Sequence, residues 1–258
     1  MTIHTRIPAY IINIKTSTVR RRYMEYLLKD YSFLDIEFVD AVDGRILSNN
    51  ELDRQFDGEL SYKKYGRKLN KGEMGCSLSH IKCYEKLIES DDNFALILED
   101  DISIINDINI LKEKRTGQLL NRETPTIILL SGDYWYYKAD SICKVFSAVG
   151  GYSFIINKTA AKLLLTDRPA FTVADDWDHI RSKGIKLYAF KPYLIDANLN
   201  MDQLSSDIKQ EYWGAKKSKM SLRFLMKHLY CQLIKLFLFK IHHFESKVRV
   251  INNKPVTK

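Results

Sequence analysis

The stretch that decides the fold is residues 71–101, which read KGEMGCSLSHIKCYEKLIESDDNFALILEDD. Asn70 and Glu73 form a capping box, and the apolar positions that follow keep helical spacing to about Glu89. The run FALIL at 94–98 is short, apolar and typical of a buried strand. A helix followed by a buried strand that ends on three carboxylates predicts a polar site at the edge of an α/β sheet.

Strand-like and helix-like segments alternate on both sides of this stretch. We expect strands at 9–14, 35–42, 126–130, 150–156 and 187–190, and helices at 19–29, 48–56, 158–165 and directly after Asp176. Residues 57–69 are polar and read as irregular. This order predicts a Rossmann-like α/β fold with a mostly parallel sheet flanked by helices, which binds ligands beyond the carboxyl ends of its strands. The polar residues expected there are Asn13, Asp43, Glu99, Asp101, Ser131 and Asp133.

Three adjacent carboxylates, Glu99, Asp100 and Asp101, end the strand at 94–98. Ionising all three side by side costs energy without a cation, and Mg²⁺ or Mn²⁺ prefers oxygen ligands. Because alternate residues of an extended segment point the same way, we expect Glu99 and Asp101 to face one ion. Asp100 would then point to a ribose hydroxyl or a structural donor. A solvated acidic turn or a helix cap is the alternative.

Two further positions have both a functional and a structural interpretation. Arg20 lies in the first turn of the 19–29 helix, where a cation opposes the helix dipole, so it indicates either a nearby anion or a solvated face. His80 lies one turn after Cys76 on the 71–89 helix. A lone helix histidine is more often a packed residue than a ligand.

A second acidic pair, Asp175 and Asp176, precedes Trp177 at a helix start. Its structural interpretation is N-capping. Its functional interpretation is a general base, a carboxylate that takes the proton of a substrate hydroxyl. Trp177 would then stack on a sugar face. The sequence does not decide which of the two carboxylates is the base.

Four segments together resemble glycosyltransferase family 25, the bacterial lipooligosaccharide galactosyltransferases related to collagen galactosyltransferases. They are IPAYIINIKTSTVRRRYM at 7–24, FVDAVDG at 38–44, the helix and strand at 71–101, and GGYSFIINKTAAKLLL at 150–165 with VADDW at 173–177. The helix and strand carry the most specific part of the resemblance. It spans roughly residues 7–204 and does not include the basic C-terminal part.

The resemblance implies a GT-A fold and an inverting, divalent-metal-dependent transfer of a hexose, with galactose favoured, from a UDP-sugar. The acceptor it implies is the saccharide of a bacterial lipooligosaccharide or lipopolysaccharide. The metal is Mn²⁺ or Mg²⁺. By position, Glu99 and Asp101 would bind the metal, and Asp175 or Asp176 would hold the acceptor end. The remaining expected positions are Asn13, Arg20 and Asp43 in the nucleotide pocket, Ser79 and His80 near the donor sugar, and Asp196, Asp202 or Gln203 as a third metal ligand.

The net charge of +8 is concentrated in residues 216–258, which hold eleven Lys or Arg and one acid, Glu245. A helix drawn from Leu222 to Phe239 has an apolar sector, so we expect a 1–215 glycosyltransferase domain followed by a basic amphipathic tail on an anionic membrane surface. The alternatives are packing on its own domain or in a homodimer, while the long apolar runs argue against nucleic acid. The helix's apolar sector holds Leu222, Leu225, Met226, Leu229, Leu233, Leu236 and Phe237.

Targeting and cysteine patterns indicate the compartment. The chain shows no signal peptide and no window of about eighteen apolar residues, so we expect a cytoplasmic protein on the inner face of the cytoplasmic membrane. Four cysteines without a CxxC pair are expected to be free thiols. Two other classes are weighed: a non-catalytic saccharide-binding membrane protein, and a nucleotidyltransferase. The intact EDD and DDW motifs argue against the first, and the lack of a glycine-rich or lysine-rich loop after the first strand against the second.

Overall fold

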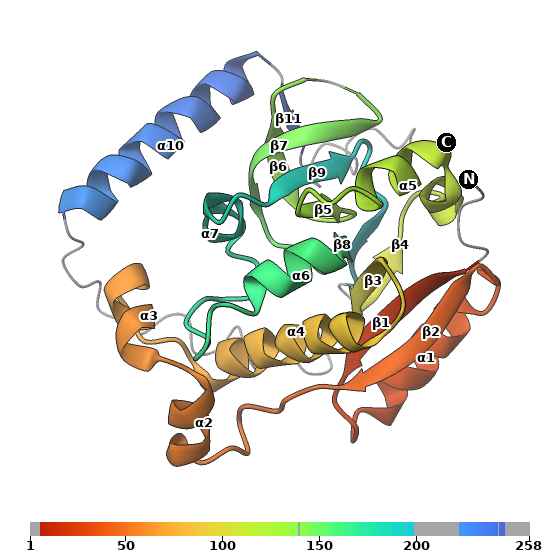
Figure 1. Cartoon of the computed structure of the whole chain (residues 1–258), viewed down its shortest axis with the longest axis horizontal. Coiled ribbons are helices and arrows are strands. Elements are labelled where there is room, and N and C mark those ends of the chain that lie inside the picture. Colours follow the sequence, from red (N-terminus) through yellow and green to blue (C-terminus); the bar gives the residue numbers. More distant parts are fainter. Residues whose placement is uncertain (1–5, 139, 199–221, 242, 246–258) are drawn as a thin grey trace, which may run out of the picture.

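The computed structural model describes residues 6–138, 140–198, 222–241 and 243–245. Within them the fold is built on a nine-stranded sheet (Figure 1). In spatial order the strands are β11 (Phe244–Glu245), β6 (Asp133–Tyr136), β7 (Ile142–Val149), β9 (Lys186–Phe190), β5 (Thr126–Leu129), β8 (Ser153–Asn157), β3 (Phe94–Glu99), β1 (Ile7–Asn13) and β2 (Leu34–Asp40). A separate antiparallel pair joins β4 (Ile102–Ile104) to β10 (Ile195–Ala197).

The strands β1, β2, β3, β5 and β9 share one direction. β1 is parallel to both β2 and β3, and β5 is parallel to β9. β8 runs antiparallel between β3 and β5, so those two strands also point the same way. The carboxyl ends of β1, β2 and β3 therefore meet at one edge, together with the Gly150–Gly151 turn that leads into β8. This arrangement confirms the α/β fold class.

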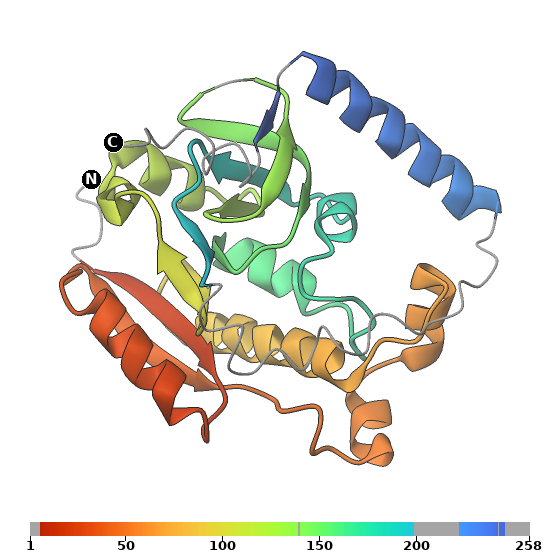
Figure 2. The ribbon, with the colours of Figure 1, turned by 180° about the vertical axis from the view of Figure 1, so that it is seen from behind.

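Helices cover both faces of the sheet (Figures 1 and 2). Strand alternation separates the two cores: Tyr10 and Ile12 of β1 pack on one side, and Ala9 and Ile11 on the other. The first side is covered by α4 (Lys71–Glu89), α6 (Lys158–Leu164) and α7 (Trp177–Ser182), and the second by α1 (Thr18–Leu28), η1 (Ile108–Lys112) and α5 (Lys114–Leu120).

Local capping chemistry sets the helix boundaries that the sequence predicted. The capping box of Asn70 and Glu73 starts α4, and that of Ser48 and Glu51 starts α2 (Asn49–Gln55). Asn157 accepts a bond from the backbone N–H of Ala160 and starts α6. In each case a side chain satisfies an N–H group that has no partner inside the helix.

The prediction of an irregular segment at 57–69 is wrong for most of its length, because this segment contains α3 (Gly58–Tyr65). Asp57 caps its start by accepting from the backbone N–H of Leu60, and Gly66 ends it with a φ of 68° in the left-handed region. Those two residues were the available signal, since Asp at the N-cap and Gly after the last turn are favoured helix ends. The hairpin of β6 and β7 was also missed.

A close approach of backbones fixes α4 against the turn that follows β2. A Cβ atom added to Gly75 would lie 2.5 Å from the carbonyl oxygen of Val42, and one on Gly44 would lie 1.9 Å from that of Lys71. Ser79 links the same two elements, since its hydroxyl accepts from the backbone N–H of Val42 and donates to the Gly75 carbonyl. The glycines at these positions therefore let the helix and the turn touch.

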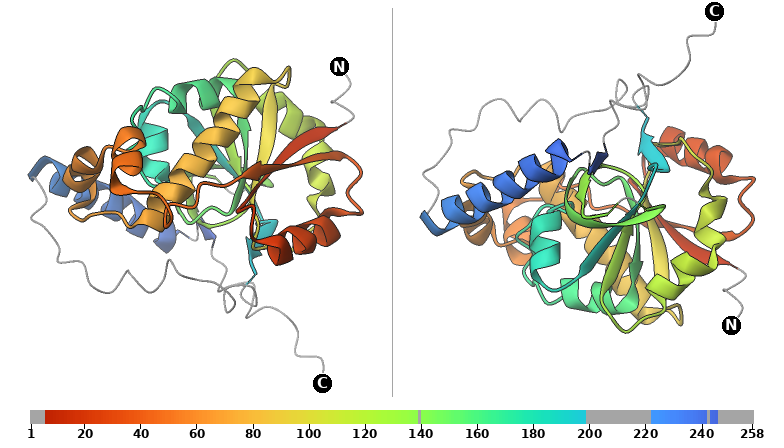
Figure 3. Two further views of the ribbon diagram at one scale, coloured as in Figure 1. Left: turned by 90° about the horizontal axis from the view of Figure 1, so that it is seen from below. Right: turned by 90° about the horizontal axis from the view of Figure 1, so that it is seen from above.

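The predicted C-terminal helix is confirmed as α10 (Leu222–Lys240), at the far end of the molecule from α1 and β2 (Figure 3). Its buried residues Cys231 and Leu238 pack on Phe146 of β7, whereas the predicted apolar sector faces solvent. Within that sector, the residues whose side chains are described are 50% to 66% exposed: Met226, Leu229, Leu233, Leu236 and Phe237.

Several sequence expectations fall outside the described residues. These are the boundary between residues 215 and 216, the candidate ligands Asp202 and Gln203, and most of the basic residues of the tail. Of the helices that the structure does describe, none combines the length and the apolar character that crossing a membrane requires. The four cysteines are free, as expected.

Candidate functional site

The carboxyl edge of the sheet gathers donor atoms from α4 and from the end of β3. Glu99 lies on the same side of β3 as Ile97, which packs in the core beneath α4. Its Oε1 atom is 3.9 Å from Cys76 Sγ and 3.7 Å from His80 Nε2. Cys76 and His80 are four residues apart on α4, so they lie on one face of the helix. One ligand atom from each of the three residues lies within 4.8 Å of the others.

His80 is a buried ring with unused polar atoms. It is 2% exposed and stacks on Phe154, with ring centroids 5.6 Å apart. Neither Nδ1 nor Nε2 has a hydrogen-bond partner. Leaving such groups unsatisfied in the interior costs free energy. The sequence placed His80 near the donor sugar, and the structure places it against the Glu99 carboxylate.

Asp100 and Asp101 do not continue the alternation of the strand. β3 ends at Glu99, and the next two residues form a turn before β4. Asp100 is buried, accepts from Asn13 Nδ2 at 2.6 Å, and accepts from Arg20 at 2.8 Å. Asp101 lies 3.2 Å from the same Arg20 nitrogen. The geometric premise that Glu99 and Asp101 point the same way in an extended segment is therefore wrong, and their shared metal stays a prediction.

Arg20 has carboxylate partners instead of a solvated face. Its guanidinium group bridges the two aspartates, and its side chain is 18% exposed. The buried Asp100 thus has a cation and an amide donor, which is the condition under which a buried charge is tolerated. Asn13, Arg20 and Asp100 form one connected polar group, and the nucleotide pocket expected around Asn13 and Arg20 stays a prediction.

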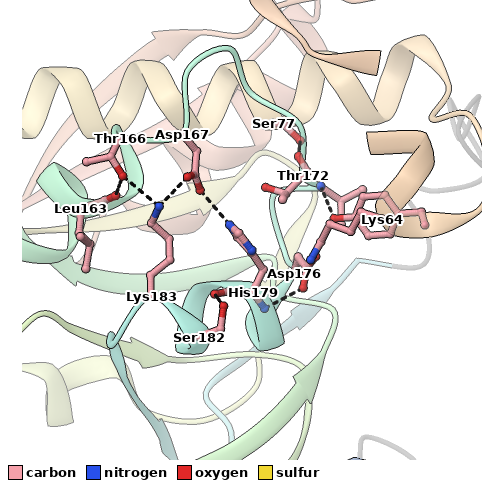
Figure 4. A network of polar contacts seen from close by, with 12 residues as sticks. Lys64, Ser77, Leu163, Thr166, Asp167, Thr172, Asp176, His179, Ser182 and Lys183 are labelled. Atoms are coloured by element: carbon pink, nitrogen blue, oxygen red, sulfur yellow. Dashed lines mark hydrogen bonds and ion pairs between the residues drawn. The ribbon is translucent and has the colours of Figure 1, made fainter. Parts of the chain in front are cut away.

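The two residues of the second acidic pair have different environments. Asp176 caps α7: its Oδ1 accepts from the backbone N–H of His179 at 2.9 Å, and its Oδ2 accepts from the Tyr65 hydroxyl at 2.6 Å. Lys64 Nζ lies 3.2 Å away, and Figure 4 shows Asp176 between Lys64 and the start of α7. The capping interpretation therefore holds for Asp176.

Asp175 as a residue is exposed to solvent. Its carboxyl group is nevertheless surrounded by protein atoms on several sides. Crowding by protein atoms, and then the nearby Glu99 carboxylate, raise the pKa of Asp175 above its usual range, while His80 acts in the opposite direction. These two influences place Asp175 in the same neighbourhood as the donor atoms of α4 and β3. A carboxyl group with a raised pKa that water can still reach is suited to accept a proton.

Other predicted site residues contact neighbouring groups of the protein, and their expected roles in the site stay predictions. Ser79 joins α4 to the turn after β2 and is 1% exposed, so its hydroxyl is occupied by backbone groups. Asp43 forms a two-nitrogen contact with Arg45, which lowers the pKa of Asp43. Asp196 accepts from the backbone N–H of Ala197.

The expected stacking of Trp177 on a sugar is wrong. Trp177 is 1% exposed, and its indole N–H donates to the Gly150 carbonyl at 2.7 Å. A Cβ atom on Gly151 would lie 2.4 Å from the Trp177 ring. The ring thus packs beneath the turn before β8 and holds α7 against the sheet.

A polar network that sequence reasoning missed holds α7 to the loop after α6 (Figure 4). His179 Nε2 lies 2.8 Å from Asp167 Oδ2, and Lys183 donates to Asp167 Oδ1 at 2.5 Å. Thr166 accepts a further bond from Lys183. The network fixes the segment that carries Asp175, and no local sequence pattern joins its residues.

Comparison with known proteins identifies the family. The family described as Glycosyltransferase family 25 (LPS biosynthesis protein) matches residues 6–177, which is most of the region with the site. The chain belongs to glycosyltransferase family 25.

Individual relatives cover parts of the chain. A procollagen galactosyltransferase 1-B of Xenopus laevis is 24% identical over 217 residues, covering 72% of this chain and 35% of its own length. A glycosyltransferase 25 family member of Aedes aegypti is 38% identical over 96 residues, covering 36% of this chain and 16% of its own. The chain therefore spans about a third or less of the length of these curated relatives.

Solved structures show more distant similarity. The galactosyltransferase LgtC, in complex with donor and acceptor sugar analogs, matches with a TM-score of 0.36 and 11% identity over 70% of this chain and 73% of its own. A glucose-1-phosphate thymidylyltransferase from Bacillus anthracis matches with a TM-score of 0.41 and 10% identity over 71% of this chain and 87% of its own.

Proposed function

We propose that this protein transfers galactose from UDP-galactose, with inversion, to the saccharide of a bacterial lipooligosaccharide or lipopolysaccharide. The family membership and the procollagen galactosyltransferase relative support galactosyl transfer. The observation that carries the proposal is the meeting of Glu99 and the Asn13–Arg20–Asp100 group at the neighbouring ends of β1 and β3, with Asp175 near enough to Glu99 for that carboxylate to raise its pKa. Ligands of open α/β sheets bind at this edge.

Asp175 is the general base in this proposal. Its side chain reaches solvent, so an acceptor hydroxyl can approach it, and its raised pKa improves its match to a proton acceptor. Asp176 is occupied as the cap of α7 and by Tyr65. The structure therefore favours one member of a pair that the sequence left open.

Arg20 and Asn13 position the nucleotide. Both side chains come from β1 and the helix that follows it, and both are held by the buried Asp100. Such fixed polar groups cost no reorganisation when the donor binds. The third part of the proposed site is a divalent cation at Glu99. When bound, it would offset the negative charge that develops on the departing diphosphate. The cluster fits a cation because the unsatisfied Nε2 atom of His80 faces the Glu99 carboxylate.

The membrane is the proposed location of the acceptor. α10 exposes five large apolar residues along one side, and the helix belongs to residues 216–258, whose sequence holds eleven Lys or Arg. Apolar insertion and attraction to anionic lipid act together in such helices, with roughly 1 kcal/mol per basic residue near the surface. We therefore place the protein on the inner face of the cytoplasmic membrane, where the apolar stripe would not remain in water.

The test of the activity is donor turnover combined with two matched variants. Purified protein is incubated with UDP-galactose, UDP-glucose and UDP-N-acetylhexosamines, with Mn²⁺ or with EDTA, and UDP release is measured. We expect UDP-galactose to be turned over in the presence of the metal. Release of pyrophosphate instead of UDP would indicate a nucleotidyltransferase. Binding of saccharide without turnover of any donor would indicate the non-catalytic alternative.

Asp175→Asn and Asp176→Asn separate the two carboxylates. We expect Asp175→Asn to bind donor normally and to lose at least about a hundredfold in transfer rate, as for removal of a general base. Asp176→Asn keeps one oxygen for the cap but loses the second oxygen, which accepts from Tyr65, and the charge beside Lys64, so it should lower thermal stability while keeping most of the transfer rate. The opposite pattern would assign the base to Asp176.

A vesicle experiment tests the location. The full chain and the double variant Leu233→Ser/Phe237→Ser are floated with vesicles that contain phosphatidylglycerol, and with neutral vesicles as a control. We expect only the parent protein to float with the anionic vesicles. Unchanged flotation of the variant contradicts membrane contact through this stripe, and a shift from dimer to monomer in the variant would assign the stripe to a homodimer interface.

A further inference from the structure

The cluster of Cys76, His80 and Glu99 has the chemistry of a transition-metal site and differs from the all-oxygen carboxylate site that the sequence suggested. Thiolate and imidazole ligands suit zinc-like ions, whereas Mg²⁺ takes carboxylates, carbonyls and water. The three ligand types here are sulfur, nitrogen and oxygen. All three occur in natural zinc sites.

The spacing of the donor atoms fits one small ion. In a tetrahedral site with bonds of about 2.0–2.3 Å, neighbouring ligand atoms are about 3.3–3.7 Å apart. Glu99 Oε1 lies 3.7 Å from His80 Nε2 and 3.9 Å from Cys76 Sγ. A movement of a few tenths of an ångström would bring these two pairs of atoms to such separations, and the donor atoms of Cys76 and His80 lie within 4.8 Å of each other.

The buried histidine is a second and independent observation. His80 is 2% exposed, both of its ring nitrogens lack a hydrogen-bond partner, and Nε2 faces Glu99. If the ring served only to fill space, an apolar side chain in its place would leave no polar atom unsatisfied. A metal bond to Nε2 gives one of the two nitrogens a partner.

The cluster is also open on one side. The Glu99 side chain is 29% exposed, so solvent reaches the carboxylate, while His80 is enclosed and Cys76 as a whole residue is half-buried. Three protein ligands with a remaining accessible position is the pattern of catalytic zinc sites, in contrast to the four-ligand structural sites.

We propose that Cys76, His80 and Glu99 bind one zinc-class divalent ion in a site that keeps an open coordination position. The proposal assigns α4 a direct role, since two of the three ligands come from successive turns of that helix. It rests on the proposed function only for the role of the ion beside the diphosphate, because binding of the ion itself needs neither donor nor acceptor.

The experiment titrates metal-free full-length protein with Co²⁺ alone and records its absorption spectrum. A cobalt–thiolate bond gives a charge-transfer band in the near ultraviolet. We expect one Co²⁺ per chain, with that band, and displacement by Zn²⁺ but not by an equal concentration of Mg²⁺. Absence of the band in the parent protein, or displacement by Mg²⁺ as readily as by Zn²⁺, overturns the proposal while leaving the glycosyltransferase activity to its own assay.

Two cysteines on α4 supply a matched control. Cys76→Ser removes the soft ligand, whereas Cys83→Ser changes a buried cysteine two turns along the helix, outside the cluster. We expect Cys76→Ser to lose the band and to weaken Co²⁺ binding at least about tenfold, because even the loss of a group that only orients a ligand costs about that much. Cys83→Ser should keep both. Glu99→Gln should keep the band with weaker binding. Retention of the band in Cys76→Ser, or its loss in Cys83→Ser alone, contradicts the assignment.

Discussion

Gly75→Ala tests the contact between α4 and the turn after β2, on which the geometry of the cluster depends. Gly75 precedes Cys76, and its α-carbon faces backbone atoms of Val42 and Gly44. The added Cβ atom would lie 2.5 Å from the Val42 carbonyl oxygen and 2.7 Å from the Gly44 nitrogen. Neither neighbour is the end of a flexible side chain, so α4 or the turn must move.

The magnitude follows from two opposing effects. An unhindered Gly→Ala change inside a helix gains about 1 kcal/mol in helix propensity. The clash falls short of an ordinary 3.4 Å contact by nearly 1 Å, and overpacking of this kind costs about 1–3 kcal/mol or more. With two backbone contacts we take the upper end, which leaves a net loss of about 2 kcal/mol in the free energy of unfolding. The displaced helix would also move Cys76 and His80 away from Glu99.

The measurement is urea unfolding followed by circular dichroism, with Gly58→Ala as the control. Gly58 is the first residue of α3, and a Cβ atom there would meet nothing within 4 Å. We expect the control to gain up to about 1 kcal/mol and Gly75→Ala to lose about 2 kcal/mol. A Gly75→Ala protein that is as stable as its parent would refute the close approach, and with it the reason why α4 presents its ligands to β3.

The remaining predictions concern α3 and the turn before β8. Tyr65→Phe removes the hydroxyl that Asp176 accepts from, and should cost about 1–3 kcal/mol in thermal unfolding with little effect on donor binding. Burial, and then Asp176, raise the pKa of Tyr65, so its contribution to stability is complete below about pH 10 and lost as the pH rises above that value. Unfolding titrations should therefore show a shallower alkaline loss of stability in Tyr65→Phe than in the parent, and equal slopes would contradict this. Gly151→Ala should destabilise by about 1–3 kcal/mol because its Cβ atom meets the enclosed Trp177 ring; a stable variant with unchanged tryptophan fluorescence would count against that packing.

Local sequence signals were sufficient to predict those helices and strands whose boundaries are set by residues within or next to the element itself. The capping boxes at Ser48 and Asn70 bound α2 and α4 because a side chain and a backbone N–H three residues on are close in any conformation that starts a helix. The buried strand β3 followed from its unbroken apolar run, since a strand covered on both faces has no polar side. The family motif at 71–101 likewise lies in consecutive elements.

Contacts between distant residues were not available to that reasoning. The hairpin of β6 and β7 has a bulge at Trp135 and Tyr136 and no clear alternation, so its pairing is decided by the rest of the sheet. The side chains of α10 show why the apolar pattern of a helix is insufficient to predict which of its sides is buried. The helix was predicted, but which of its two partly apolar sides packs depends on the shape of the β6–β7 surface that receives Cys231 and Leu238.

The sequence by itself determined the strand that ends in carboxylates, the helix before it and the family to which both belong. Only the tertiary structure decided what each carboxylate faces. Glu99 meets Cys76 and His80 because α4 packs on its side of β3, whereas Asp100 turns to Asn13 and Arg20. Adjacent residues acquire different partners because the strand ends between them, and the partners come from segments 80 or more residues away in the chain or from another helix layer.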